Sequence, residues 1–268
     1  MNNTNNVAEK KSNTPILIIG VVLVAALLAG WYLLSSPKTA TNTNTSTANK
    51  TNTATTGRQT TIPANAPQGA TPPNQQGSPT ALVTLEEFAD FQCPQCGAVH
   101  PIMNEIKSTY GSRIRFIFRN LPLAIPAHDK SYNAAVACEA AGMQNPNKFW
   151  ELQNLLFANQ KAWTADPNYR TTWKDYAQKI GLDVAKWEND MAGIAAKSRV
   201  DEDMRRAKAI GVNSTPTLYI NGIDVPFQQM TVAGLKQLID AELAKAAPQN
   251  QTAPAAPAAP ANTGNTNK

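Results

Sequence analysis

Apolar residues recur at two different spacings between positions 81 and 246. Arg113–Arg119 alternates apolar with polar residues, and Ala81–Ala89 has the composition and length of a strand. Between them, the stretch from Cys93 to about Tyr110 has helical spacing and closes near Gly111. This region therefore predicts a strand, a helix and a second strand.

The next ninety residues have helical spacing throughout, and Asp183 and Gly211 stand at cap positions. Two short strands should follow, separated by Asn221-Gly222, a dipeptide typical of tight hairpin turns. The predicted helices are Ser131–Ala141, Lys148–Asn159, Thr172–Ile180, Val184–Ala209 and a final Val232–Lys245, and the hairpin strands are Thr217–Ile220 and Ile223–Phe227.

The predicted order is strand, helix, strand, helical block, hairpin, helix. A strand–helix–strand unit completed by a hairpin and a helix is the thioredoxin plan. We therefore predict an α/β thioredoxin fold with a helical subdomain inserted at about residues 128–210. Residues 81–246 are enough for one domain with a sizeable core.

The N-terminal region has a different pattern. Ile16–Leu34 carries no charge, follows Lys10 and Lys11 and closes with Trp31-Tyr32, so it predicts a transmembrane anchor over 16–34. The flanking residues favour a cytoplasmic N-terminus over 1–15 and place the rest of the chain outside, in a single-pass protein of the cell membrane. A cleaved signal peptide is the alternative. Either way the domain faces a compartment in which disulfides persist.

Two segments lack the apolar residues that a folded core needs. Residues 35–80 are rich in Thr, Asn and Pro and predict a disordered tether, and residues 247–268 predict a disordered Ala/Pro tail. The net charge of +5 lies outside residues 81–246, because that region carries 18 basic and 18 acidic residues. A nucleic-acid partner is therefore not expected.

The candidate chemistry lies at Cys93-Pro94-Gln95-Cys96, where the predicted helix begins. Two cysteines at this spacing share the first helical turn and can form a small disulfide ring. Unpaired backbone N–H groups at the helix start stabilise a thiolate at Cys93 and lower its pKa. We expect Cys93 to be the accessible, reactive sulfur and Cys96 to be deeper and more protonated.

Other uses of a Cys-x-x-Cys pair remain open but fit less well. Haem attachment needs a His after the second Cys, and Gly97 stands there. A zinc site would need two more ligands from Cys138, His100 and His128, so we expect no metal and no cofactor. A purely structural disulfide gains little from so short a loop.

Four stretches, taken in order, resemble the DsbA-like family of disulfide oxidoreductases, particularly its membrane-anchored bacterial members. They are Glu87–Gly97, Phe118–Leu123, Lys148–Trp150 and Gly211–Thr217. The resemblance implies dithiol–disulfide exchange on exported proteins, with Cys93 attacked first and Cys96 as the resolving thiol. It also implies a cis-proline loop in which Thr215 and Pro216, together with Pro94 and Gln95, meet the substrate.

One residue departs from the family pattern. Strongly oxidising relatives carry His where this chain has Gln95, and an amide supplies no positive charge to the Cys93 thiolate. We therefore expect a milder oxidant, within the span from about −120 mV for DsbA to about −270 mV for thioredoxin.

Further residues have a functional and a structural interpretation. Glu87 is in phase with Val83 and Leu85 on the first strand, and it either relays protons beneath the dithiol or is a solvated charge at a strand end. We expect Cys138 to be a small buried apolar residue, His100 to pack or lie at the surface, and His128 and Asp129 to cap the inserted helices.

The sequence thus predicts a protein disulfide oxidoreductase that donates its Cys93–Cys96 disulfide to exported Cys-containing proteins. The expected reoxidant is a membrane protein of the DsbB or vitamin K epoxide reductase type, which the tether would let the domain reach. The alternatives are an extracytoplasmic reductase or isomerase and a non-catalytic membrane-tethered binding module.

Overall fold

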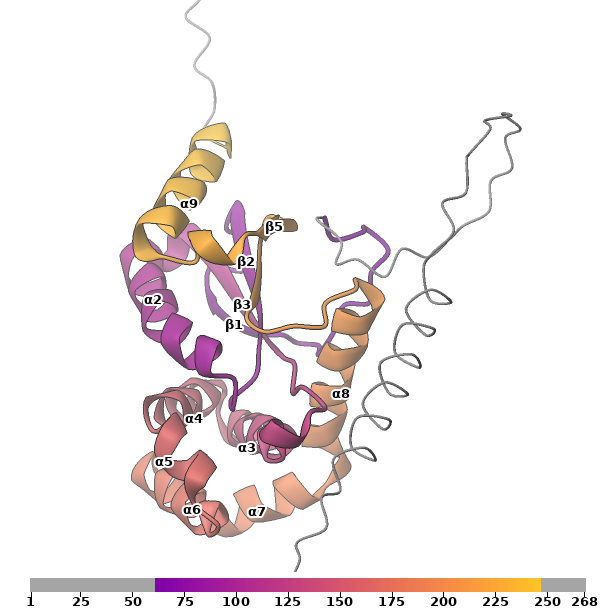
Figure 1. Cartoon of the computed structure of the whole chain (residues 1–268), viewed down its shortest axis with the longest axis vertical. Coiled ribbons are helices and arrows are strands. Elements are labelled where there is room, and N and C mark those ends of the chain that lie inside the picture. Colours follow the sequence, from indigo (N-terminus) through magenta and orange to yellow (C-terminus); the bar gives the residue numbers. More distant parts are fainter. Residues whose placement is uncertain (1–60, 247–268) are drawn as a thin grey trace, which may run out of the picture. The chain divides into compact units, whose positions relative to one another are not determined.

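The computed structural model describes residues 61–246, which fold around a five-stranded sheet of order β1-β3-β2-β4-β5 (Figure 1). Strands β2 and β3 are parallel, and the other neighbouring pairs are antiparallel. The strands are β1 Asn74–Gly77, β2 Val83–Ala89, β3 Ile114–Asn120, β4 Thr217–Ile220 and β5 Ile223–Val225. From β2 onward, the elements follow the predicted order.

Helices cover both faces of the sheet. Helices α2 (Pro94–Tyr110) and α9 (Val232–Ala246) lie together on one side, and α8 (Ile194–Ala209) lies on the other (Figure 1). The parallel β2–β3 pair requires the crossover that α2 supplies. This arrangement confirms the thioredoxin-like α/β fold, with a helical block inserted between β3 and β4.

The inserted helical block runs from residue 131 to residue 209, close to the predicted 128–210. The predicted single helix over Val184–Ala209 is wrong, because Gly193 is extended (φ −68°, ψ 175°) and divides it into two. A short helix at Gln160–Ala165 was not predicted by the pattern. Besides α8, the helices are α3 Ser131–Gln144, α4 Pro146–Ala158, α5 Gln160–Ala165, α6 Tyr169–Lys179 and α7 Val184–Ala192.

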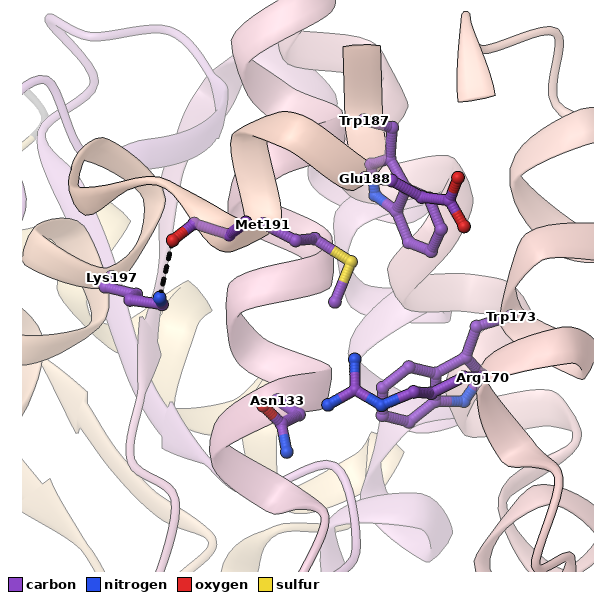
Figure 2. Close-up of a pocket in the computed structure, with 8 residues that line it drawn as sticks. Asn133, Arg170, Trp173, Trp187, Glu188, Met191 and Lys197 are labelled. Atoms are coloured by element: carbon purple, nitrogen blue, oxygen red, sulfur yellow. Dashed lines mark hydrogen bonds between the residues drawn. The ribbon is translucent and has the colours of Figure 1, made fainter. Parts of the chain in front are cut away.

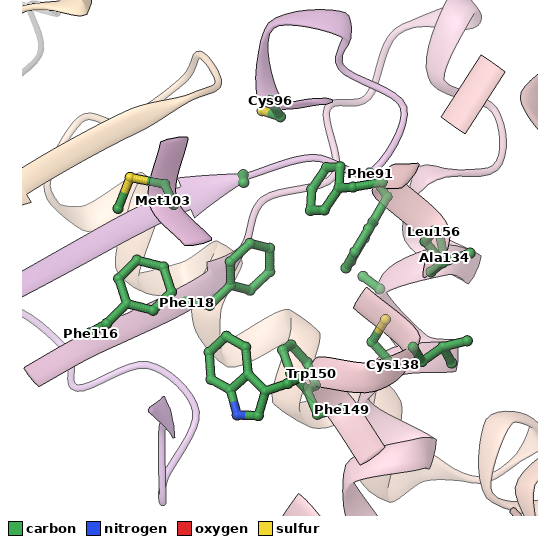
Figure 3. Close-up of a cluster of buried hydrophobic side chains, with 14 of the residues drawn as sticks. Phe91, Cys96, Met103, Phe116, Phe118, Ala134, Cys138, Phe149, Trp150 and Leu156 are labelled. Atoms are coloured by element: carbon green, nitrogen blue, oxygen red, sulfur yellow. The ribbon is translucent and has the colours of Figure 1, made fainter. Parts of the chain in front are cut away.

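Alternation along β2 sends its side chains to two different cores. Leu85 joins the larger cluster beneath α2, α4 and α9, whereas Phe88 packs with Tyr219 on the face covered by α8. Figure 3 shows Cys96 at one end of the larger cluster and Cys138 among the inserted helices. The redox pair therefore sits on the rim of the main core.

The ordered domain begins earlier than predicted. The prediction of a disordered tether over 35–80 is wrong for residues 61–80, because β1 pairs with the edge of β3 and Ala70 is buried. Asn74–Gly77 has no apolar side chain, so hydrophobic patterning gave no signal for this strand. The rest of the predicted tether, the 16–34 anchor, the 1–15 terminus and the 247–268 tail lie outside the described residues.

Buried charges hold this N-terminal segment on the sheet. The Arg119 guanidinium donates to the Ala70 carbonyl at 3.1 Å, and Asp203 accepts the Ala70 N–H at 2.9 Å. Arg206 and Arg199 donate in the same way to the carbonyls of residues 67 and 72. Backbone groups that would be costly to bury unpaired are thereby satisfied.

The C-terminal hairpin matches the prediction at its turn. Asn221 and Gly222 both have positive φ (48° and 78°), as a two-residue hairpin turn requires. The second strand ends at Val225, two residues earlier than predicted, and a short 3-10 helix, Phe227–Gln229, follows. None of the helices between residues 61 and 246 is long and apolar enough to cross a membrane.

Candidate active site

The two cysteines sit where β2 leads into α2. Cys93 is the N-cap residue, with extended backbone angles (φ −68°, ψ 119°), and Pro94 is the first helical residue. Proline fits there because the first N–H groups of a helix have no intrahelical partner. Cys93 and Cys96 are free thiols, so the structure holds the reduced form.

The loop before β4 meets the cysteine pair. The Cys93 Sγ lies 3.3 Å from the Thr215 carbonyl oxygen and 3.5 Å from Gln95 Oε1. The Thr215–Pro216 peptide bond is cis. Residues more than a hundred positions apart, which the sequence proposed as one site, are therefore in contact.

The prediction of an exposed Cys93 sulfur is wrong for this form. Only 3% of Cys93 is exposed, because the Thr215 carbonyl and the Gln95 side chain close over its sulfur. Pro94 and Gln95 themselves are exposed. These two residues are therefore the part of the motif that a substrate can contact at the surface.

The two thiols differ in acidity as predicted. A hydrogen bond from the Cys96 side chain, followed by contacts with Thr215 and backbone amides, outweighs burial and lowers the pKa of Cys93 to about 5. Burial, the bond to Cys93 and the charges of Cys93 and Glu87 raise the pKa of Cys96 well above its usual range. The pair thus combines a stabilised thiolate with a protonated thiol.

Glu87 lies inside the protein, not at a solvated strand end. It is 5% exposed, and its register partners on the neighbouring strands are Phe118 and Leu218. Burial raises the pKa of Glu87 to about 7, and the charge of Lys107 lowers it only in part. A carboxyl with this pKa exchanges its proton near neutral pH, and its charge acts on Cys96.

Asp90 organises the approach to Cys93, although its sequence context did not single it out. Its Oδ1 accepts hydrogen bonds from the Gln92 N–H and the Ser131 hydroxyl. Its Oδ2 accepts from the Leu123 N–H and from His128 Nδ1, both within 2.8 Å. One buried carboxylate therefore fixes the redox loop and the connection into the helical block.

His128 and Asp129 do not cap the inserted helices as predicted. His128 binds Asp90, Asp129 accepts a hydrogen bond from the Gln92 side chain at 3.2 Å, and α3 begins after Lys130 without a side-chain cap. These residues hold the redox loop instead. The reason is tertiary, because their partners lie 37 to 38 positions earlier in the chain.

A second polar contact comes from the helical block. Gln160, the first residue of α5, donates from Nε2 to the carbonyl oxygens of Phe91 and Cys93, at 2.8 Å each. No local pattern points to Gln160, because these partners lie 69 and 67 positions away in sequence. The amide links the insertion to the redox loop.

Two other predicted roles are confirmed. Cys138 is fully buried, and burial raises the pKa of its thiol, as expected of a small core residue. His100 stacks on Phe157 with ring centroids 4.7 Å apart and bonds Asn154. Burial lowers the pKa of His100 to about 4, so it packs as a neutral ring. The described residues hold no group of three His, Cys, Asp or Glu side chains able to bind a metal.

Two cavities differ in what lines them. A groove of about 620 Å³ borders the redox helix, between Pro94 and Gly97 on one side and Phe157 and Gln160 on the other. A pocket of about 310 Å³ lies inside the helical block, where Trp173 and the other side chains in Figure 2 surround it. Only the groove of these two is lined by residues of the redox helix, because Pro94 and Gly97 border it and no residue of α2 lines the pocket in the helical block.

The family comparison agrees with this geometry. A family model described as thioredoxin matches residues 70–241, which include β1 and the whole site. The chain belongs to this thioredoxin family. The matched range begins before residue 81, as the ordered structure does.

Solved structures share the fold. BdbD from Bacillus subtilis (oxidised) has a TM-score of 0.57 at 23% identity and covers 67% of this chain and 98% of its own. The thiol-disulfide exchange protein alpha-DsbA2 from Wolbachia pipientis has a TM-score of 0.53 at 17% identity, covering 64% and 87%. A thioredoxin-like oxidoreductase from Silicibacter pomeroyi DSS-3 has a TM-score of 0.51 at 24% identity, covering 65% and 92%. The fold is therefore that of the DsbA-like proteins.

Sequence relatives include much longer proteins. The chain is 35% identical over 149 residues to a Na(+)/H(+) antiporter NhaA 1 of Mycolicibacterium gilvum, and the match covers 55% of this chain and 23% of the antiporter. An antiporter NhaA 3 of Salinispora tropica matches at 35% over 147 residues and 21% of its length. The chain thus spans less than a quarter of these relatives.

Proposed function

We propose that this protein is a thiol-disulfide oxidoreductase that donates a Cys93–Cys96 disulfide to cysteines of exported proteins. The observation that carries the proposal is the asymmetry of the pair, with a pKa of about 5 at Cys93 and a strongly raised pKa at Cys96. A structural disulfide or an inert binding site has no need of it. Thiol–disulfide exchange does, because a low-pKa thiolate is a good leaving group.

The reaction follows from the positions of the two sulfurs. A substrate thiolate attacks Cys93 Sγ, the Cys93–Cys96 bond breaks, and Cys96 leaves as a thiolate that takes up a proton. A second substrate thiolate then attacks the substrate sulfur of the mixed disulfide, and Cys93 leaves as a thiolate. Two substrate thiolates become a disulfide, and the enzyme disulfide becomes the Cys93 thiolate and the Cys96 thiol. Two electrons pass from the substrate to the enzyme, and one proton is taken up at Cys96.

We assign the proton for Cys96 to Glu87. Its pKa of about 7 allows it to hold a proton at neutral pH and to release it to a more basic thiolate. The raised pKa of Cys96 favours this transfer. Once protonated, Cys96 attacks the mixed disulfide slowly, so the reaction proceeds toward the substrate disulfide.

The acidity of Cys93 can be compared with that of two known oxidoreductases. Thioredoxin, a reductant, has a thiol pKa of about 7, and DsbA, a strong oxidant, has about 3.5. The value of about 5 lies between them. It fits a milder oxidant than DsbA, in keeping with Gln95 in place of a charged residue.

Location and partners complete the proposal. The uncharged stretch 16–34 would anchor the chain in the cell membrane with the domain outside, where disulfides persist. A membrane reoxidant of the DsbB or vitamin K epoxide reductase type would restore the disulfide. Antiport is not proposed, because more than three quarters of the antiporters' length has no counterpart in this match.

Mixed disulfides in cells test the proposal. In full-length protein, Cys96→Ser removes the resolving thiol, so Cys93 should accumulate as adducts with exported Cys-containing proteins. Non-reducing gels of alkylated cells, followed by mass spectrometry, would identify them. Cys93→Ser should carry none, and Cys138→Ser, which alters a buried thiol away from the pair, should behave like the unsubstituted protein. If Cys96→Ser carries no adducts, the protein is a binding module and not a disulfide donor.

A further inference from the structure

The Gln160 amide holds the backbone of the redox loop at two points. Its Nε2 lies 2.8 Å from the carbonyl oxygens of both Phe91 and Cys93, which flank Gln92. The Cys93 carbonyl also accepts the first hydrogen bond of α2, from the Gly97 N–H at 3.1 Å. Cys93 is therefore fixed from its own helix and from the helical block at once.

Fixing this backbone fixes the reactive sulfur. The Cys93 Sγ is one rotatable bond away from the Cα, so its contacts with the Cys96 thiol and the Thr215 side chain depend on where the main chain lies. Those contacts lower the pKa of Cys93, and they are made in the dithiol form. A support that holds the loop in this position therefore acts on the dithiol form, in which the Cys93 thiolate makes these contacts.

Gly97 shows how closely the two elements approach. A Cβ built on Gly97 would lie 2.6 Å from Gln160 Oε1, which is too close for any real contact. Gly97 lies inside α2, where glycine is a poor helix former and no positive φ requires it. The glycine is explained by the space that the Gln160 side chain needs.

We propose that Gln160 is a positioning residue through which the helical insertion sets the acidity and redox equilibrium of Cys93. The inference rests on the proposed oxidoreductase function and adds to it a long-range contribution from a segment outside the Cys-x-x-Cys motif. Gly97 is its counterpart, because its missing side chain lets the amide reach the two carbonyls.

The test is the equilibrium of the full-length protein with glutathione, in which the enzyme disulfide and two reduced glutathiones give the enzyme dithiol and one oxidised glutathione. Gln160→Met keeps the side-chain length but cannot donate a hydrogen bond. It should shift this equilibrium about three- to tenfold toward the disulfide, the size expected from one or two net hydrogen bonds, or about 15–30 mV. The Cys93 pKa, followed by thiolate absorbance, should rise.

Gln144→Met is the matched control. Gln144 also joins two segments of the helical block by its amide, donating to the Asp183 carbonyl at 2.8 Å and accepting from the Asp183 N–H at 3.0 Å, so these hydrogen bonds lie away from the redox loop. The control should leave the equilibrium and the Cys93 pKa unchanged. Equal shifts in both variants would mean general loosening of the helical block and would overturn the proposal.

Gly97→Ala perturbs the Gln160 side chain without changing Gln160 itself. Its methyl group should displace Gln160 and shift the equilibrium in the same direction as Gln160→Met, and the double variant should shift no further than the larger single one. Additive shifts would overturn the proposal. If the unsubstituted protein exchanges with glutathione and Gln160→Met matches it, only the role of Gln160 fails. If the unsubstituted protein does not exchange at all, the proposed function fails.

Discussion

Glu86 and Glu87 are neighbours on β2, and each is 5% exposed, yet their pKa values are shifted in opposite directions. Glu86 points to the face covered by α8, and Glu87 points to the face covered by α2. Burial by itself would raise the pKa of both carboxyls. What differs is the set of partners that each face supplies.

On the α8 face, two arginines outweigh burial. Arg119 and Arg206 each donate to Glu86 at 2.7 Å, and Arg206 does so with two nitrogens. The hydrogen bond from Arg206 and the charge of Arg119 hold the pKa of Glu86 below its usual value. Glu86 stays ionised and serves as a structural anchor for strands and helix.

On the α2 face, Glu87 has apolar neighbours and one partial counter-charge. Its pKa of about 7 lets the proton come and go at neutral pH. The comparison shows that burial alone does not decide what a carboxylate does. Paired with arginine it stays ionised and holds the fold, and beside Phe118 and Leu218 it has a pKa near neutrality, as the proton transfer proposed above requires.

The largest expected effect comes from removing the charge of Glu86. Glu86→Gln leaves Arg119 and Arg206 buried without their counter-charge and should cost about 3–5 kcal/mol of the free energy of unfolding at pH 7. Urea unfolding followed by circular dichroism would measure it.

Glu87→Gln is the matched control, one residue away and equally buried. It should not destabilise the protein at pH 7, because no arginine there loses a partner. Equal losses of stability for the two variants would contradict the separate roles assigned to the two carboxyls.

A smaller effect should appear in the pH dependence of Glu87→Gln. Folding raises the pKa of Glu87 from 4.5 to about 7. The contribution of Glu87 to the free energy of unfolding is therefore fully present below about pH 4.5 and is lost as pH rises through 7. The variant keeps a neutral group throughout. It should therefore come close to the unsubstituted protein at pH 4.5 and exceed its stability by about 3 kcal/mol at pH 8.

Unfolding curves of both proteins in the oxidised form, measured from pH 4.5 to pH 8, isolate this effect because the Cys93 thiolate is then absent. A stability difference that does not change with pH would mean that Glu87 does not titrate in this range. It could then not serve as the proton donor to Cys96.

Local chemistry was enough to predict the face of the strand on which Glu87 lies, but it left open whether Glu87 relays protons or is a solvated charge. Alternation along β2 placed Glu87 in phase with the core residues Val83 and Leu85, and the Cys pair at a helix start indicated the redox site. The Asn221-Gly222 turn was predicted in the same way, from the φ values that those two residues allow. In each case the signal and its structural consequence lie within a few residues.

The partners of Glu86, in contrast, come from segments that are distant in the sequence. Glu86 meets Arg206 across 120 positions, and Ala70 meets Asp203 across 133. Polar residues in such a network look like surface residues in the sequence. For that reason β1 was assigned to a tether, and the hydrogen bonds of Asp90 and Gln160 were not foreseen. Gly193, which ends α7, could be read in the sequence, but whether a glycine divides a helix depends on tertiary packing.

The smallest expected effect concerns the one charge that acts on Glu87. Lys107 lowers the pKa of Glu87, while its ammonium lies 4.9 Å from the Phe116 ring and 5.0 Å from the Trp150 ring. Burial lowers the pKa of Lys107 itself to about 8, so the ammonium is still charged at neutral pH. Lys107→Met keeps an apolar side chain against the two rings and removes the charge.

The Glu87 pKa should then rise by about one unit above its present value, the low end of what an opposite charge contributes. Carbon-13 NMR of the Glu87 carboxyl in labelled, oxidised protein, titrated from pH 5 to pH 9, would measure it, with Lys236→Met as the control because its ammonium lies 3.5 Å from Glu105 instead. A rise in Lys107→Met but not in Lys236→Met would show that Glu87, like Glu86, has a cationic partner. The two carboxyls would then differ in how strongly that partner lowers the pKa. A fall, or an equal rise in the control, would show that Lys107 does not act on Glu87 and that burial alone sets its acidity.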